Sequence, residues 1–102
     1  FGTPNPTPYE ALMSLYAERA DDITVLSLYK LAAERNIWSS QMLCQVLHCF
    51  NVMGVPELME SYFTAELNTG KDLTFGFVEM LTYYSQRGDV LNLDRLMAQS
   101  EA

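Results

Sequence analysis

The amino-acid sequence repeats with a period of 34 residues, and this period limits the folds that the chain can adopt. Sliding the chain against itself by 34 positions aligns seven columns that are apolar in all three copies and an eighth column of small residues. The apolar columns are Tyr9/Leu43/Phe77, Leu12/Val46/Met80, Met13/Leu47/Leu81, Tyr16/Phe50/Tyr84, Val25/Met59/Leu93, Leu28/Tyr62/Leu96 and Tyr29/Phe63/Met97, and the small column is Ala20/Gly54/Gly88. A period of roughly 20 to 50 residues is typical of supersecondary units that stack and bury their apolar faces against their neighbours.

Within each copy the apolar columns form two sets, and each set has the spacing of one helix face. Counted from the first column, the offsets are 0, 3, 4 and 7, followed by 16, 19 and 20, as on one face of an α-helix. The small column lies between the sets, where a chain that reverses direction needs glycine or a near substitute. Acidic residues or proline follow it at 21–22, 56–57 and 89, which suits a helix N-terminus. The sequence therefore predicts hairpins with helices near 8–19 and 22–36, 40–53 and 56–68, and 74–87 and 90–100.

The alternative is an irregular bundle of six unrelated amphipathic helices, because a chain that is 49% apolar supplies some coincidences by chance. Eight columns in one helical register, with the turn residue fixed, favour the repeat. A chain of 102 residues is one domain by length. We therefore expect a single all-α domain of three helix-turn-helix hairpins, with repeats at about 7–40, 41–74 and 75–102.

The charge and the apolar runs exclude some classes of partner. Six Lys and Arg against thirteen Asp and Glu leave a net charge of −7, and the cations are spread along the chain, so the footprint for nucleic-acid phosphates is poor. No apolar run approaches the roughly 18 residues that span a bilayer, so we expect no membrane insertion. Cys44 and Cys49 lie five residues apart in one predicted helix and point in different directions. We expect reduced thiols and a non-secretory compartment.

The repeat resembles the superfamily of tetratricopeptide and pentatricopeptide repeats. Residues 9–40, "YEALMSLYAERADDITVLSLYKLAAERNIWSS", follow the pentatricopeptide pattern without a gap, and "FVEMLTYYSQRGDVLNLDRLM" (77–97) follows it nearly as well. The middle copy keeps "LCQVLHCFNVMG" in its first helix but has a looser match, "ELMESYF", in its second. Bulky residues in the columns that begin with Met13 and Val25 are more similar to pentatricopeptide than to tetratricopeptide repeats. The resemblance implies a right-handed α-solenoid.

Pentatricopeptide proteins characteristically bind single-stranded RNA in mitochondria and plastids, with one base read per repeat. The resemblance maps the first reading position onto Glu10, Cys44 and Val78 and the second onto approximately Ser40 and Thr74. Val78 offers no hydrogen bond to a base edge and Cys44 only a weak one, and Glu10 would place a carboxylate near phosphates. Because the net charge is also −7, RNA binding by this segment is disfavoured.

The leading hypothesis is a non-catalytic scaffold or accessory subunit that binds other protein subunits of an organellar assembly, such as a mitochondrial ribosome, an RNA-processing or editing complex, or an ATP synthase. Stacked hairpins form an extended concave surface lined by the first helix of each repeat. Its candidate residues are Glu10, Ser14, Cys44, His48, Val78 and Thr82. The resemblance implies a mitochondrial location; otherwise we expect a cytoplasmic one. The alternatives are an RNA-binding pentatricopeptide protein and a tetratricopeptide-like peptide clamp, which would need a cluster of Lys, Arg and Asn that we do not find.

Other candidate sites favour packing over chemistry. Cys44 and His48 have the i, i+4 spacing of metal ligands, but no second cluster completes a four-ligand zinc site. No nucleophile motif or phosphate loop accompanies His48, so we expect no enzyme, cofactor, metal or small-molecule substrate. Glu57 and Glu60 are expected to be solvated on polar helix faces. Trp38, outside the register, either packs at the junction between repeats or anchors a partner.

The last predicted helix carries apolar residues that a following helix would cover in a solenoid. These are Leu93, Leu96 and Met97, and the five residues after Met97 are too few to form such a cap. We expect this edge to be a docking surface, covered by further chain or by a partner.

Overall fold

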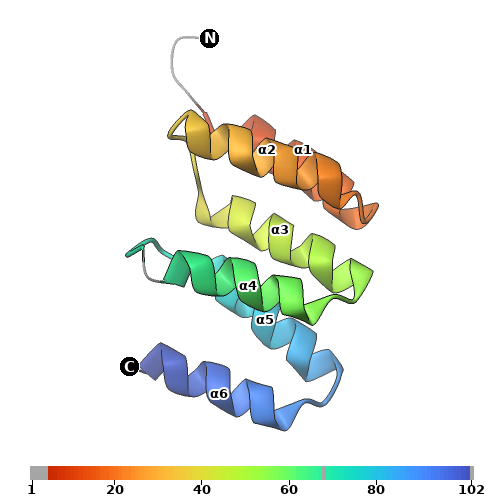
Figure 1. Ribbon diagram of the computed structural model, residues 1–102, viewed down its shortest axis with the longest axis vertical. Helices are drawn as coiled ribbons and strands as arrows, with labels where there is room; N and C mark the ends of the chain where they lie inside the picture. Colours follow the sequence, from red (N-terminus) through yellow and green to blue (C-terminus); the bar gives the residue numbers. More distant parts are fainter. Residues whose placement is uncertain (1–4, 68, 102) are drawn as a thin grey trace.

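A computed structural model describes residues 5–67 and 69–101 of the chain, and these residues are all-α (Figure 1). They form six helices and no strand: α1 Thr7–Glu18, α2 Asp22–Glu34, α3 Ser40–Met53, α4 Pro56–Leu67, α5 Thr74–Gln86 and α6 Val90–Glu101. The predicted all-α class is confirmed, and the predicted helix bounds agree with these to within two residues. The predicted end of the fourth helix at residue 68 lies outside the described residues.

The turn inside each hairpin is built in the same way. Ala20, Gly54 and Gly88 all adopt the left-handed backbone conformation, with φ of 56°, 75° and 66°, which glycine adopts without the steric cost that a Cβ imposes. In each turn the residue that follows donates its backbone N–H to the carbonyl four residues before the small residue, at 3.0 to 3.1 Å. The small column of the sequence is therefore a column of helix C-terminal turns.

Side chains cap three of the helices that follow a turn or loop, and at α6 the carboxylate of Asp89 accepts from the backbone N–H of Asn92 at 3.2 Å. The carboxylate of Asp21 accepts from the backbone N–H of Thr24 at 3.2 Å, and the Ser39 hydroxyl accepts from the N–H of Met42 at 3.3 Å. Such caps satisfy backbone donors that the first turn of a helix leaves without a partner.

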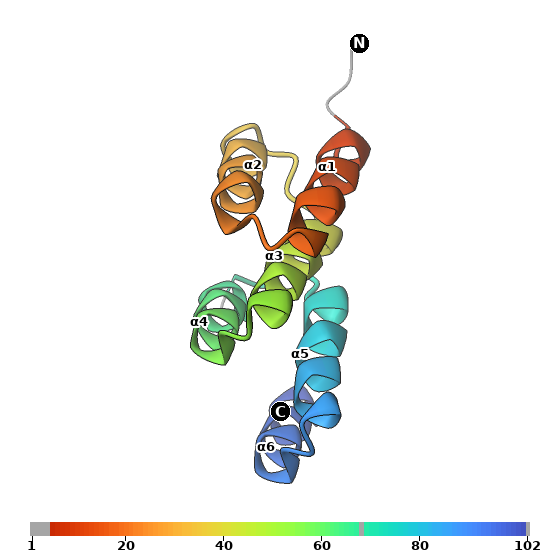
Figure 2. The same ribbon diagram turned by 90° about the vertical axis from the view of Figure 1, so that its right-hand side faces the viewer.

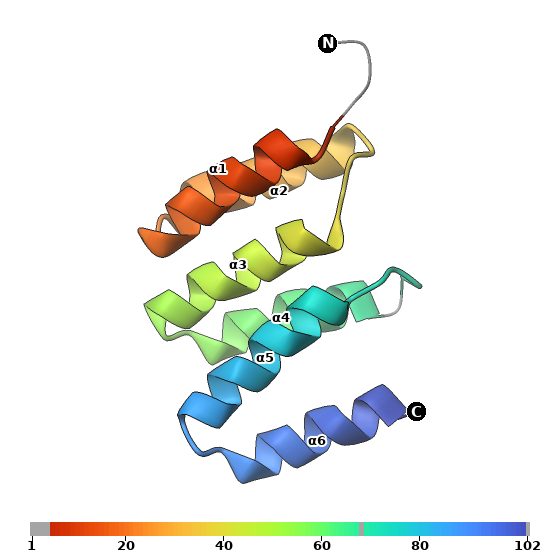
Figure 3. The same cartoon turned by 180° about the vertical axis from the view of Figure 1, so that it is seen from behind.

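The odd-numbered helices form one layer of the molecule. Helix α1 packs on α3 and α3 packs on α5, while α2, α4 and α6 each pack on the helix that precedes them. Figure 2 shows α1, α3 and α5 stacked along the long axis with α2 and α4 on one side of them, and Figure 3 shows the odd-numbered layer from behind. The resulting body is elongated, with extents of 46 × 30 × 17 Å.

Helix α3 is the centre of the core because it has neighbours on several sides. Six of its residues are buried: Met42, Leu43, Val46, Leu47, Cys49 and Phe50. Gly76 of α5 lies directly against it, since a Cβ built at Gly76 would come within 3.1 Å of Leu43 and 3.2 Å of Leu47. The two helices can approach this closely because position 76 has no side chain. None of the described helices combines the length and apolarity that crossing a membrane requires.

Candidate functional site

The six residues predicted to line the concave surface all lie on the odd-numbered layer. Glu10 and Ser14 are on α1, Cys44 and His48 on α3, and Val78 and Thr82 on α5. Val78 is exposed and the other five are partly buried. The Ser39 hydroxyl donates to Glu10 at 2.5 Å, and the Thr82 hydroxyl donates to the carbonyl of Val78 at 2.8 Å.

His48 joins the three helices of this layer. Its Nε2 lies 2.6 Å from Oε1 of Glu18 on α1, and its Nδ1 lies 2.6 Å from Oε1 of Glu79 on α5. An ionised carboxylate only accepts hydrogen bonds, so an imidazolium that donates from both nitrogens satisfies both neighbours. The side chain of Glu79 is only 12% exposed, whereas that of Glu18 is 67% exposed. The bond to Glu79 is therefore the better shielded of the two.

The surroundings of His48 act on its pKa in opposite directions. Burial lowers the pKa of the imidazole, but the hydrogen bonds and charges of Glu18 and Glu79 raise it by more, and the net shift is upward from 6.5. The protonated form of His48 is thereby stabilised relative to that of a free imidazole. The ring of His48 thus bridges α1 and α5 through two carboxylates.

The prediction identified His48 but missed both of its partners. Glu18 lies four residues after Ser14, and Glu79 lies three residues before Thr82. One helical turn therefore separates each carboxylate from the row that contains Ser14, His48 and Thr82. A search for carboxylates one helical turn away from the aligned positions on the neighbouring helices would have identified Glu18 and Glu79 as partners of His48.

The i, i+4 pair of Cys44 and His48 does not gather further ligands in the structure. Among the residues described, no group of three or more His, Cys, Asp and Glu side chains could hold a metal ion. Burial, with a smaller contribution from Glu79, raises the pKa of Cys44 to about 11, so the thiol is protonated at neutral pH. Cys49, buried on the same helix, has its pKa raised to about 11 by burial and by Asp22 and Asp21. Neither thiol has the electropositive setting of a reactive cysteine.

Trp38 packs at the junction between the first and second hairpins. Its indole Nε1 donates to the hydroxyl of Tyr29 at 2.8 Å, and that hydroxyl donates to Glu66 at 3.2 Å. Lys71 lies over the indole ring, 4.5 Å from the ring centroid, and pairs with Glu66 at 3.1 Å. The loop before α3 and the loop before α5 are thus connected, as the packing alternative for Trp38 expects. Its role as a partner anchor stays a prediction.

An apolar cleft lies between α4 and α5, and it contains one predicted concave residue. We call it the α4–α5 cleft; its volume is about 350 Å³. The residues that line it are Phe63, Leu67, Lys71, Leu73, Thr74, Phe77 and Val78. Val78 is 54% exposed at this cleft, and the packing of α4 on α5 is less extensive than that of α2 on α3. Sequence reasoning found Val78 but not the cleft, because the cleft depends on how far the two helices separate.

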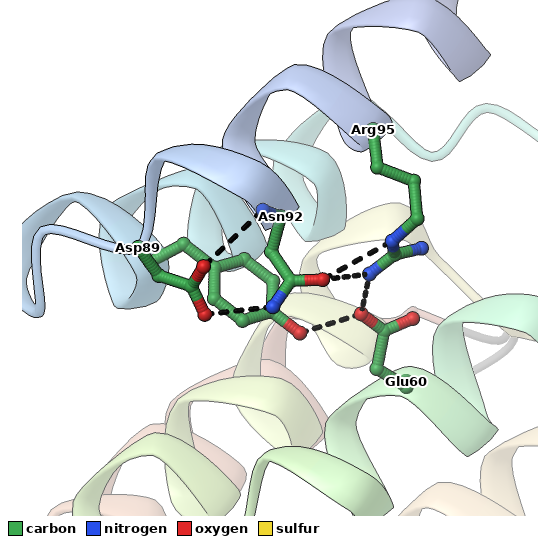
Figure 4. A network of polar contacts seen from close by, with 5 residues as sticks. Glu60, Asp89, Asn92 and Arg95 are labelled. Atoms are coloured by element: carbon green, nitrogen blue, oxygen red, sulfur yellow. Dashed lines mark hydrogen bonds and ion pairs between the residues drawn. The ribbon is translucent and has the colours of Figure 1, made fainter.

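A polar network connects α4, α5 and α6 (Figure 4). Glu60 accepts from the hydroxyl of Tyr84 at 2.5 Å and from the guanidinium of Arg95. Arg95 also donates to Asn92 at 2.9 and 3.1 Å, and the amide of Asn92 donates to Asp89 at 2.7 Å. Burial and the carboxylate of Glu60 raise the pKa of Tyr84. The network borders a cleft of about 470 Å³ and acts as a clamp between the second and third hairpins.

This network corrects the expectation that Glu57 and Glu60 are alike. Glu57 is exposed as expected, whereas Glu60 is partly buried and bound to groups of two other helices. A helical-face pattern predicts which side a residue lies on, but it does not reveal a tyrosine and an arginine that another helix brings to it.

The predicted C-terminal docking edge is also corrected in one residue. Leu96 is fully buried in the core cluster, so its assignment to an exposed edge is wrong. The reason is that α6 packs on α5 and directs Leu96 inward. Leu93 is partly buried against the same cluster, and Met97 is 49% exposed.

Comparison with known proteins adds no family assignment. No protein-family model, no curated protein and no solved structure matches this chain.

Proposed function

We propose that this chain is a right-handed helical-repeat scaffold that binds other protein subunits of a larger assembly and carries out no catalysis. The observation that carries the proposal is the burial within one sequence column. Leu12 is 46% exposed, whereas Val46 and Met80 in the same column are fully buried. This is the pattern of a stacked array, in which each first helix covers the corresponding face of the next and the first unit keeps its own face open.

The turn geometry supports the same reading of the repeat. Equivalent positions of the three hairpins share the left-handed backbone conformation and the closing hydrogen bond. Similar turns and apolar columns favour the stacking of successive hairpins, and stacked hairpins create an extended binding surface.

Protein is favoured over RNA as the partner by the chemistry of the odd-numbered layer. Glu10, Glu18 and Glu79 all bring carboxylates to this layer, and the chain as a whole carries a net charge of −7. Phosphates are repelled by such a surface. The exposed side chains of Leu15 and Val78 instead offer apolar contact area on the same helices, which suits a protein partner.

The resemblance to pentatricopeptide repeats suggests the setting. Relatives of this kind occur as accessory subunits of mitochondrial ribosomes, RNA-processing and editing complexes and some ATP synthases. We therefore place the assembly in an organelle, with the mitochondrion as first choice.

Affinity purification of the tagged chain after nuclease treatment tests the proposal. We expect a defined set of proteins to remain bound in stoichiometric amounts after all RNA is removed. Salt-dependent binding of single-stranded RNA by the isolated chain, together with loss of the proteins on nuclease treatment, would refute the scaffold role and favour RNA binding.

A further inference from the structure

The two junctions between successive hairpins differ at two aligned positions. Trp38 stands 34 residues before Asp72, and Tyr29 stands 34 residues before Phe63. At the first junction the indole of Trp38 lies against Tyr29 and donates to its hydroxyl. At the second junction the corresponding pair is a carboxylate and a phenyl ring, and Phe63 lines the open α4–α5 cleft.

We propose that the α4–α5 cleft binds an aromatic side chain of a protein partner, and that a Lys or Arg next to this side chain pairs with Asp72. The bound side chain takes the place that Trp38 holds at the first junction. This inference deepens the proposed scaffold function and rests on it.

The lining and the size of the cleft suit an aromatic ring. Five of its seven lining residues are apolar, and Phe63 and Phe77 lie with ring centroids 6.3 Å apart. A cavity of about 150 Å³ lined by apolar side chains holds a benzene molecule, so the cleft of about 350 Å³ has room for an indole or a phenol. Aromatic side chains also bury large area with few rotatable bonds, which makes them frequent anchors at interfaces.

The charge at this junction selects a cationic neighbour. Lys71 is already engaged by Glu66 and by the ring of Trp38. Asp72, next to it in the chain, is exposed and has no ion-pair partner among the described residues. The hydroxyl and the backbone N–H of Thr74 donate to Asp72 and lower its pKa, so its negative charge persists at neutral pH. A partner with Lys or Arg beside its aromatic residue complements this carboxylate and the net charge of −7.

A nucleotide base fits the same surroundings less well. Phe63, Phe77 and Val78 have no group that pairs with a base edge. The carboxylate of Asp72, which accepts a hydrogen bond from the cleft residue Thr74, would also repel the phosphates of a nucleotide bound there. A protein side chain is therefore the occupant that the cleft favours.

Titration of the ¹⁵N-labelled chain with short blocked peptides tests the inference by amide chemical shifts. The probe is Gly-Lys-Trp-Lys-Gly, compared with Gly-Lys-Ala-Lys-Gly and Gly-Glu-Trp-Glu-Gly. We expect shifts concentrated at residues 73–78 and a Kd that weakens roughly tenfold or more when Trp is replaced by Ala. The Glu peptide should bind more weakly than the Lys peptide. Equal affinity for the Trp and Ala peptides, or shifts that map elsewhere, would overturn the inference.

Variants of Asp72 distinguish the contribution of the cleft's shape to peptide binding from the contribution of its charge. Asp72→Asn should weaken the Lys-Trp-Lys peptide about two- to fivefold, and the matched charge change Glu57→Gln, at the other end of α4, should leave the Kd unchanged. Asp72→Trp, which copies Trp38 at the second junction, should abolish binding, whereas Asp72→Ala should keep the dependence on the aromatic residue. If Asp72→Trp does not fold, Asp72→Asn and the peptide series decide the question.

Titration with oligouridylate distinguishes an RNA site from a protein site in the cleft. Comparison with the affinity purification distinguishes failure of this inference from failure of the scaffold function. Oligouridylate that shifts the same amides at lower concentration than the peptide would overturn the inference in favour of a base site. If the peptides fail to bind but proteins remain on the tagged chain after nuclease treatment, the cleft assignment is wrong and the scaffold function stands. If no protein remains, the scaffold function itself fails.

Discussion

The bridge formed by His48 makes the stability of the helix stack depend on pH. The pKa of His48 is raised above its ordinary value of 6.5 in the folded chain. Its contribution to the free energy of unfolding is therefore fully present below about pH 6.5 and is lost as the pH rises through the higher folded-state pKa. The perturbation that tests this is His48→Gln, which removes the titrating group and keeps a polar side chain at the position.

The two bonds of His48 should contribute unequally. Glu79 is 12% exposed and His48 is 31% exposed, so this pair is partly shielded and is worth about 1–2 kcal/mol. Glu18 is 67% exposed, so its pair is screened by solvent and is worth about 0.5 kcal/mol. We expect His48→Gln to cost about 2 kcal/mol near pH 6 and clearly less near pH 8.5.

Urea unfolding at both pH values measures these differences. Double-mutant cycles with Glu79→Gln and Glu18→Gln isolate the two couplings. A larger coupling to Glu18 than to Glu79 would contradict the shielding argument. A cost of His48→Gln that grows as the pH rises would refute the assignment of an imidazolium bridge.

Three further pairs of substitutions test the packing of the stack by urea unfolding. Gly76→Leu should cost about 2–4 kcal/mol because its side chain enters the contact with α3, while Gly76→Ala should be within about 1 kcal/mol because the helix-propensity gain offsets a shift of nearby side-chain tips; equal effects would contradict this contact. Leu96→Ala should cost about 2–4 kcal/mol and Met97→Ala less than about 1.5 kcal/mol, since only Leu96 is fully buried. Trp38→Phe should cost about 1–2 kcal/mol because the hydroxyl of Tyr29 loses its donor. Tyr29→Phe should then cost less in this background than in the unaltered chain, because only the hydrogen bond to Glu66 remains to be lost.

The helices were predictable because their signals are local and repeated. Ala20, Gly54 and Gly88 punctuate the chain where the backbone turns left-handed, and apolar residues recur at helical spacing on both sides of them. Because the same spacing of apolar and turn residues occurs in three copies, the helix bounds predicted from one copy can be checked against the other two. The identity of the odd-numbered layer followed from the same columns.

The polar contacts were not predictable because they join residues that do not occupy aligned positions of the 34-residue repeat. The carboxylate partners of His48 lie one turn away from its row, and Glu60 is bound by side chains of two other helices. Such contacts depend on the tilt of one hairpin on the next, which a column of apolar residues does not specify. Leu96 was misplaced for the same reason, since its burial depends on how α6 leans on α5.

The two junctions differ, and the second has an apolar cleft beside Val78, a predicted concave residue. At the first junction α2 packs closely on α3, and Trp38 and Tyr29 join the two hairpins. At the second junction α4 packs less extensively on α5, and the polar clamp of Glu60 lies near the first turn of α4 while the α4–α5 cleft lies at its end. A junction clamped at one end and open at the other can admit a side chain without separating the hairpins. A partner that binds in the cleft would therefore stabilise the second junction, which has the less extensive packing. We expect the free energy of unfolding of the third hairpin to increase with the concentration of bound partner.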